Sequence, residues 1–285
     1  MTEIVSSLNS AFTLAFVITS MFGLGLGLTM GDLLAPLRNV RLVVAALFVN
    51  FVLLPGVAWL LTQVLPLQDD LKVGLILMST VAGAPLTIKA TQLARGNVAF
   101  AGSLVTFQVV VTIIYLPFAL PLLIPNATVD AVALAMPLVV QILLPLGAGL
   151  LANVRYREEA AMTRPIMTEI SNISLALMLV LNLSNVPQVL GLVSTGALAS
   201  ALGIILTGLA AGYLLGGPDQ KIRRALALGS AQRNYAAAFV IAQGRFDTRP
   251  KVFLMVLTAS LISMAVVLIA AGEFARRDRK RGGDE

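Results

Sequence analysis

Two basic residues stand where the chain is otherwise apolar enough to lie in a membrane. Arg233 falls near the middle of the apolar stretch 225–244, and Lys89 falls in the glycine- and proline-containing stretch 80–97. An ionisable side chain is expensive in hydrocarbon, so it usually faces a cavity or a partner and marks an ion or substrate path. These two side chains therefore predict a charged binding site at membrane depth.

Each cation follows a break in the helical pattern. Gly83 and Pro85 precede Lys89, and the run GSAQRN (229–234) contains Arg233. Proline removes a backbone hydrogen bond, and broken backbone at membrane depth is tolerated only inside protein or beside a wet cavity. Paired interruptions in the two halves of a chain point to a transporter's binding site. A simple kink, and a Lys89 that reaches the membrane surface, are the alternatives.

The composition is that of a membrane protein. Of 285 residues, 58% are hydrophobic and 12% are charged, whereas soluble domains have about 25% charged residues. The chain has no cysteine and no histidine, which excludes disulfides, the usual zinc sites and most nucleophile–base pairs. We therefore expect neither an enzyme nor a bound cofactor. The basic residues lie in short loops, so membrane topology explains them better than binding to nucleic acid.

A span needs roughly 20 mostly apolar residues. Nine candidates meet this condition: 9–30, 40–65, 72–94, 98–124, 130–152, 165–187, 194–216, 222–244 and 252–273. The short connectors leave no room for a soluble domain, so residues 1–285 form a single polytopic membrane domain.

The charges predict an orientation. With the N-terminus outside and the C-terminus in the cytoplasm, most basic residues fall on the inner side, as the positive-inside rule requires. The loop 245–251 departs from this pattern. The tail 274–285 is basic and is expected to contact lipid headgroups on the inner surface. The expected location is a cell membrane, of the bacterial inner-membrane kind.

Several segments resemble the bile acid:sodium symporter family. They are FGLGLGLT (22–29), QLARGNVAF (92–100), LLPLGAGLL (143–151), GYLLG (212–216) and GSAQRNYAAA (229–238). The resemblance implies an all-α fold with inverted repeats, in which a panel domain (9–30 and 130–187) faces a core domain (40–124 and 194–273). It also implies that the two broken helices cross in the core, and that transport proceeds by alternating access.

The sodium ligands implied by the resemblance are mostly missing. The expected oxygen donors fall on Ile88, Ala101, Val105, Gly229 and Arg233. Only Asn50, Thr87 and Asn234 keep a suitable oxygen. Sodium prefers several oxygen ligands, as other hard cations do. The region that corresponds to the ion sites comprises Asn50, Thr87, Lys89, Gly229, Gln232 and Arg233.

We therefore hypothesise that Arg233 replaces a sodium ion as a built-in cation. Lys89 either does the same or titrates as a proton carrier, with Glu169 as a second candidate carrier. The expected cargo is a small organic anion, either a carboxylate or a bile-acid-like molecule. Its expected neighbours are Thr87, Lys89, Thr91, Gln92, Asn182, Arg233, Asn234 and Tyr235, although any of them can serve a helix–helix hydrogen bond instead.

Three other functions stay open. They are a sodium-coupled symporter with an altered site, an exporter of related fold, and a receptor-like membrane protein. The sequence leaves open the substrate, the direction of transport and the oligomeric state.

Overall fold

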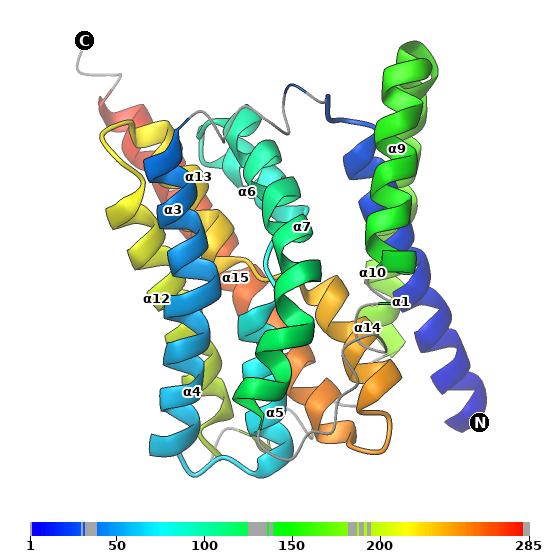
Figure 1. The fold of residues 1–285 in the computed structure, drawn as a ribbon, viewed down its shortest axis with the longest axis vertical. Helices are drawn as coiled ribbons and strands as arrows, with labels where there is room; N and C mark the ends of the chain where they lie inside the picture. Colours follow the sequence, from blue (N-terminus) through cyan, green and yellow to red (C-terminus); the bar gives the residue numbers. More distant parts are fainter. Residues whose placement is uncertain are drawn as a thin grey trace.

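The computed structural model describes residues 2–29, 31, 39–124, 136, 139–181, 187, 191–192 and 195–281. Within these residues every regular element is a helix and none is a strand, which confirms the all-α fold class. Figure 1 shows the helices running mostly along the long axis of the molecule.

One group of helices lies at the right of Figure 1. It consists of α1 (Thr2–Gly25), α9 (Leu144–Arg155) and α10 (Arg157–Leu181), with α1 packed against both of the others. The π-helix η3 (Val139–Leu143) leads directly into α9. These helices come from the residues predicted for the panel.

The remaining helices pack together on the other side. They are α3 (Val40–Phe48), η2 (Val49–Leu53), α4 (Leu54–Val64), α5 (Asp69–Thr80), α6 (Leu86–Leu93), α7 (Val98–Leu123), α12 (Ala197–Leu215), α13 (Gln220–Ala231), α14 (Tyr235–Arg245) and α15 (Pro250–Arg281). They come from the residues predicted for the core, and α14 also contacts α1. That the two groups move as separate rigid domains stays a prediction.

The two spans predicted to be broken are each a pair of half-helices. Residues 81–84 separate α5 from α6, and residues 232–234 separate α13 from α14. The breaks touch each other, because the backbone N–H of Asn234 donates to the carbonyl of Val81 at 3.2 Å. Gly83 has φ +85°, and a Cβ there would lie 2.6 Å from the carbonyl oxygen of Val105.

The second break begins later than the sequence suggests. Gly229 and Ser230 are still helical, and α13 ends at Ala231. Gly229 instead serves close packing, because a Cβ there would lie 3.1 Å from Leu104 and 3.3 Å from Thr87.

Five helices in the described residues are long and apolar enough to cross a membrane. They are Ser7–Gly25, Val40–Val64, Val98–Leu123, Ala197–Leu215 and Pro250–Asp278. The spans 72–94 and 222–244 are absent from this set because each is split into short halves. The spans 130–152 and 165–187 lie partly outside the described residues, so the number nine stays a prediction.

Two predicted non-helical segments are helical in the structure. α10 begins at Arg157, where Glu158 and Glu159 in its first turn suit the positive end of a helix. α15 continues to Arg281, past the predicted start of the tail. Glu273 supports this extension through ion pairs with Arg276 and Arg277 at 2.7 and 2.9 Å, three and four residues further on.

The outer surface is strongly apolar. Large hydrophobic side chains such as Phe118, Leu122, Leu214 and Ile269 are more than 70% exposed. Such a surface suits acyl chains rather than water. Together with the apolar helices, it identifies a multi-pass membrane protein.

Glycine sets the distance between α1 and α9. A Cβ on Gly149 would overlap the carbonyl oxygen of Phe22, and a Cβ on Gly25 would overlap that of Leu146. These are backbone contacts, so a side chain at either position would force the two helices apart. We expect Gly149→Val to destabilise the protein by about 1–3 kcal/mol, as overpacking does. Heating the purified protein in detergent and following the monomer peak by size exclusion measures the loss.

Gly147 provides the matched control for this substitution. It lies on the same helix, and a Cβ there would meet no atom within 4 Å. Gly147→Val should leave the unfolding temperature unchanged. Equal stability of the two variants would contradict this packing.

Candidate functional site

A cavity of about 200 Å³ lies between the two groups of helices. Side chains of α1 and α10 line one wall. The starts of α6 and α14, residues 232–234 and the middle of α15 line the other. Both interrupted helices therefore contribute to this cavity.

Two half-helix N-termini border the cavity. Pro85 and Leu86 belong to the start of α6, and Asn234 and Tyr235 to the start of α14. The Asn234 side chain accepts a hydrogen bond from the N–H of Ala237 at 3.2 Å and so caps α14. Helix N-termini carry partial positive charge, which favours an anion in the space between them.

The walls contributed by α6 and α10 carry polar and cationic side chains. The Nζ of Lys89 on α6 donates to Oδ1 of Asn172 on α10 at 3.0 Å. Arg164, Thr168 and Ser171 lie on the same face of α10 as Asn172 and also line the cavity. Among the described residues that line the cavity, none is acidic. The cavity thus has an excess of positive charge.

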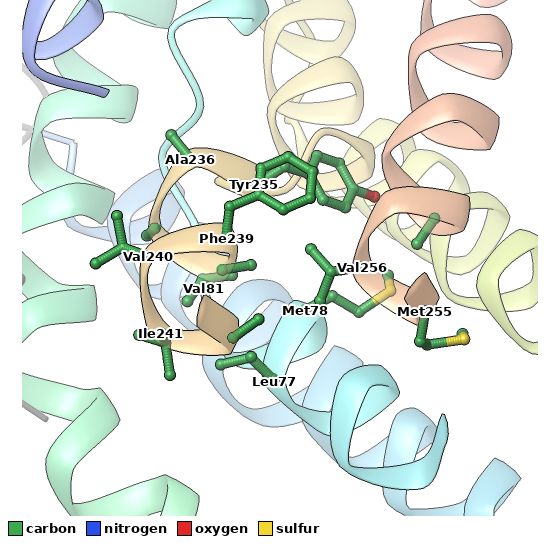
Figure 2. Packing of buried hydrophobic residues seen from close by; sticks show 14 of the residues in the cluster. Leu77, Met78, Val81, Tyr235, Ala236, Phe239, Val240, Ile241, Met255 and Val256 are labelled. Atoms are coloured by element: carbon green, nitrogen blue, oxygen red, sulfur yellow. The ribbon is translucent and has the colours of Figure 1, made fainter. Parts of the chain in front are cut away.

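The rest of the cavity lining includes apolar side chains, and it packs against the hydrophobic core. Phe16, Phe239 and Met264 contribute to it. Figure 2 shows Tyr235 and Phe239 of α14 packed with Met78 and Val256 of the neighbouring helices. This packing holds the start of α14 rigidly beside the cavity.

Arg233 borders the cavity at the meeting point of the two breaks. Its side chain is completely buried. Nη1 donates to Oδ1 of Asn50 at 2.6 Å, and Nη2 donates to the carbonyls of Asn50 at 3.3 Å and Ser79 at 2.5 Å. Nε donates to the carbonyl of Met78 at 3.2 Å. Four protein oxygens therefore converge on one guanidinium.

The oxygens that hold Arg233 come from a helix end and a helix distortion. Met78 and Ser79 lie in the last turn of α5, where the carbonyls carry partial negative charge. Asn50 lies in the π-helix η2, a local distortion common at functional sites. Its Nδ2 donates to Ser230 Oγ at 3.1 Å, which joins this cluster to α13.

The buried charge of Arg233 is balanced by dipoles. In the described part of the chain, no carboxylate forms an ion pair with it. An unpaired buried charge is costly unless hydrogen bonds satisfy it. Here three carbonyls and the Asn50 side chain provide that compensation.

The four oxygens around Arg233 already accept its N–H groups. The described residues also contain no cluster of three or more acidic, cysteine or histidine side chains that could hold a metal. That Arg233 acts as a built-in cation in place of sodium stays a prediction.

The structure brings most of the predicted residues to two adjacent places. Lys89, Gln232, Arg233, Asn234 and Tyr235 line the cavity. Asn50 does not line it but contacts Arg233 at the meeting point of the breaks. Lys89 is thus not at the crossing of the breaks, because its place in the first turn of α6 directs it toward α10.

Other predicted residues lie away from the cavity lining. Thr87 and Thr91 are fully buried in the packing of α6, and Gln92 and Glu169 are exposed without lining the cavity. Asn182 lies outside the described residues.

Arg164 is the charged residue among several cavity residues that sequence reasoning missed, such as Thr19, Ser20 and Thr168. It was assigned to a loop because span 165–187 was expected to begin after it. The spacing Arg164, Thr168, Ser171 and Leu175 repeats every three to four residues, which is the signal of one helix face. Reading that face would have placed Arg164 on α10.

Comparison with known proteins adds the family. The model of the sodium bile acid symporter family matches residues 14–195. "Probable sodium/metabolite cotransporter BASS1, chloroplastic" of Arabidopsis thaliana is 26% identical over 240 residues, which cover 82% of this chain and 60% of that protein. A similarly named BASS2 protein of Oryza sativa subsp. japonica is 26% identical over 269 residues, covering 92% of this chain and 62% of that protein.

A bacterial relative extends the comparison. "Uncharacterized sodium-dependent transporter YocS" of Bacillus subtilis is 24% identical over 246 residues, covering 84% of this chain and 75% of that protein. The chain spans about three fifths of the length of the two plant relatives. Because the family model matches well over half of the chain, the chain belongs to the sodium bile acid symporter family.

Proposed function

We propose that this protein is a secondary transporter of a small organic anion, that it works by alternating access, and that its coupling to sodium is reduced or absent. The observation that carries the last point is the guanidinium of Arg233. It donates hydrogen bonds to the carbonyls at the end of α5 and to the Asn50 side chain. A sodium ion at the same place would compete for these oxygens and be repelled by the fixed charge.

The cavity supports the class of cargo. It contains Lys89 and Arg164, two helix N-termini and an apolar lining, and its volume is about 200 Å³. Sites for drug-sized ligands measure about 300–1,000 Å³. The cavity is therefore suited to a small carboxylate rather than to a bulky sterol acid.

The structure is compatible with the orientation proposed from the charges. The start of α3 and the ends of α9 and α15 lie at the upper end of Figure 1. Basic residues occur at these ends, among them Arg41, Arg155 and Arg277. We propose that this end faces the cytoplasm of a bacterial cell and contacts lipid headgroups, with the N-terminus outside.

Coupling to protons is the companion proposal. Of the two candidate carriers, Lys89 lines the cavity and Glu169 does not. We therefore assign any proton coupling to Lys89.

The test is binding and uptake in matched salts. The unfolding temperature with an organic-acid library, and uptake into proteoliposomes, should be the same in sodium, potassium and choline chloride at equal ionic strength. A requirement for sodium at millimolar concentration would refute the reduced coupling.

A sodium-coupled symporter is the second candidate, since the names of the relatives favour it. The same salt comparison separates the two candidates. Ligand binding without flux in proteoliposomes would indicate a receptor. Flux in cells that runs only outward would indicate an exporter. The relatives are named as transporters, which supports a function other than catalysis.

A further inference from the structure

Arg164 lies where two cavities share a wall. It lines the cavity described above and also a second one of about 310 Å³, together with Gly27, Val98 and Gly102. A ligand in the first cavity can therefore reach both Lys89 and Arg164.

The Arg164 side chain is exposed, and its guanidinium lies against Gly27, just beyond the end of α1. A Cβ at position 27 would overlap its Cζ and Nε. Any residue larger than glycine at position 27 would displace it. The position of this side chain therefore depends on a close approach between α1 and α10.

Lys89 of α6 and Arg164 of α10 keep their charge uncompensated. Lys89 donates to the neutral side chain of Asn172. Arg164 has no hydrogen-bond or ion-pair partner for its guanidinium in the described part of the chain. Its five N–H donors suit a carboxylate. Leu24, Leu175 and Phe239 provide apolar lining in the same cavity.

We propose that Arg164 and Lys89 bind the two ends of an elongated dicarboxylate, with the apolar lining covering the chain between its acid groups. This inference rests on the anion transport proposed above and specifies its cargo. Arg164 and Asn172 are eight residues apart on α10, which corresponds to about 12 Å along the helix axis. Carboxylates that lie between the two cations are then on the order of 6–10 Å apart.

The test is a chain-length series of linear dicarboxylates. Their affinities for the purified full chain are measured by calorimetry in sodium-free buffer, from four to twelve carbons. Monocarboxylates of the same lengths serve as the comparison. We expect the affinity to peak at about eight carbons and to exceed that of the matching monocarboxylate about tenfold or more.

Variants assign the effect to Arg164. Arg164→Gln should remove the advantage of the dicarboxylate over the monocarboxylate of the same length. Gly27→Ala, which displaces the guanidinium without removing it, should do the same in part. Arg157→Gln is the control, because this exposed arginine lies on the same helix and lines neither cavity.

The outcomes separate this inference from the function on which it rests. If anions bind but dicarboxylates have no advantage, or if Arg164→Gln binds as wild type does, the two-point site is wrong and the proposed function stands. If no organic anion binds under any condition, both are wrong.

Discussion

Replacing Arg233 by methionine is expected to lower the unfolding temperature by about 10 °C or more and to abolish ligand binding. The substitution removes the donor from four buried oxygens. They are the backbone carbonyls of Asn50, Met78 and Ser79 and the side-chain Oδ1 of Asn50. Each unsatisfied buried group costs about 1–3 kcal/mol. The measurement is thermal unfolding in detergent, with and without ligand.

A competing effect acts in the opposite direction. Removing a buried charge also removes the penalty for burying it, and apolar replacements of complete ion pairs are often neutral or stabilising. That gain requires both partners to be replaced. Here the partners are mostly backbone carbonyls, which no side-chain substitution removes. We therefore expect the loss to dominate.

Two variants sharpen this prediction. Arg233→Lys keeps the charge but loses the planar guanidinium, which can donate to several oxygens at once. Its unfolding temperature should therefore lie between those of wild type and Arg233→Met. Lys89→Met should leave the unfolding temperature close to that of wild type, because Lys89 is exposed and makes a single side-chain hydrogen bond. If Arg233→Met and Lys89→Met unfold at the same temperature, Arg233 does not join the two breaks.

The sequence was sufficient to predict both breaks, whereas the role of Arg233 as a built-in cation stays a prediction. Gly83 and Pro85 interrupt one span by local chemistry alone. A polar run with an arginine in an apolar stretch has few stable placements other than a protein interior. Such features are set by neighbouring residues, and the structure has interrupted helices at both places.

Features that depend on contacts between distant helices were harder to predict from the sequence. Lys89 was assigned to the ion-site region because it follows the first break, but its direction depends on where α6 begins relative to α10. Gly229 was taken as part of a break, although it serves packing against Leu104. Arg164 was read as a loop charge, because apolar content does not show where a helix begins beyond the membrane.

Replacing Arg233 by glutamine is expected to make the protein respond to sodium. Without the guanidinium, the backbone carbonyls of Asn50, Met78 and Ser79 and the Oδ1 of Asn50 still converge. The glutamine side chain adds another oxygen. Hard cations prefer such oxygen ligands. We expect Arg233→Gln to be less stable than wild type in choline chloride and to regain part of the loss in sodium chloride.

The expected size of this recovery follows from mass action. A ligand at ten times its dissociation constant stabilises the folded state by about 1.4 kcal/mol, which corresponds to a rise of a few degrees in unfolding temperature. Arg233→Met is the control, because it has the same cavity without the added oxygen and should respond little. Wild type should not respond, since its own cation fills the place. An equal response of all three proteins would mean that sodium acts elsewhere, and a response of wild type alone would mean that Arg233 helps to bind the ion rather than replacing it.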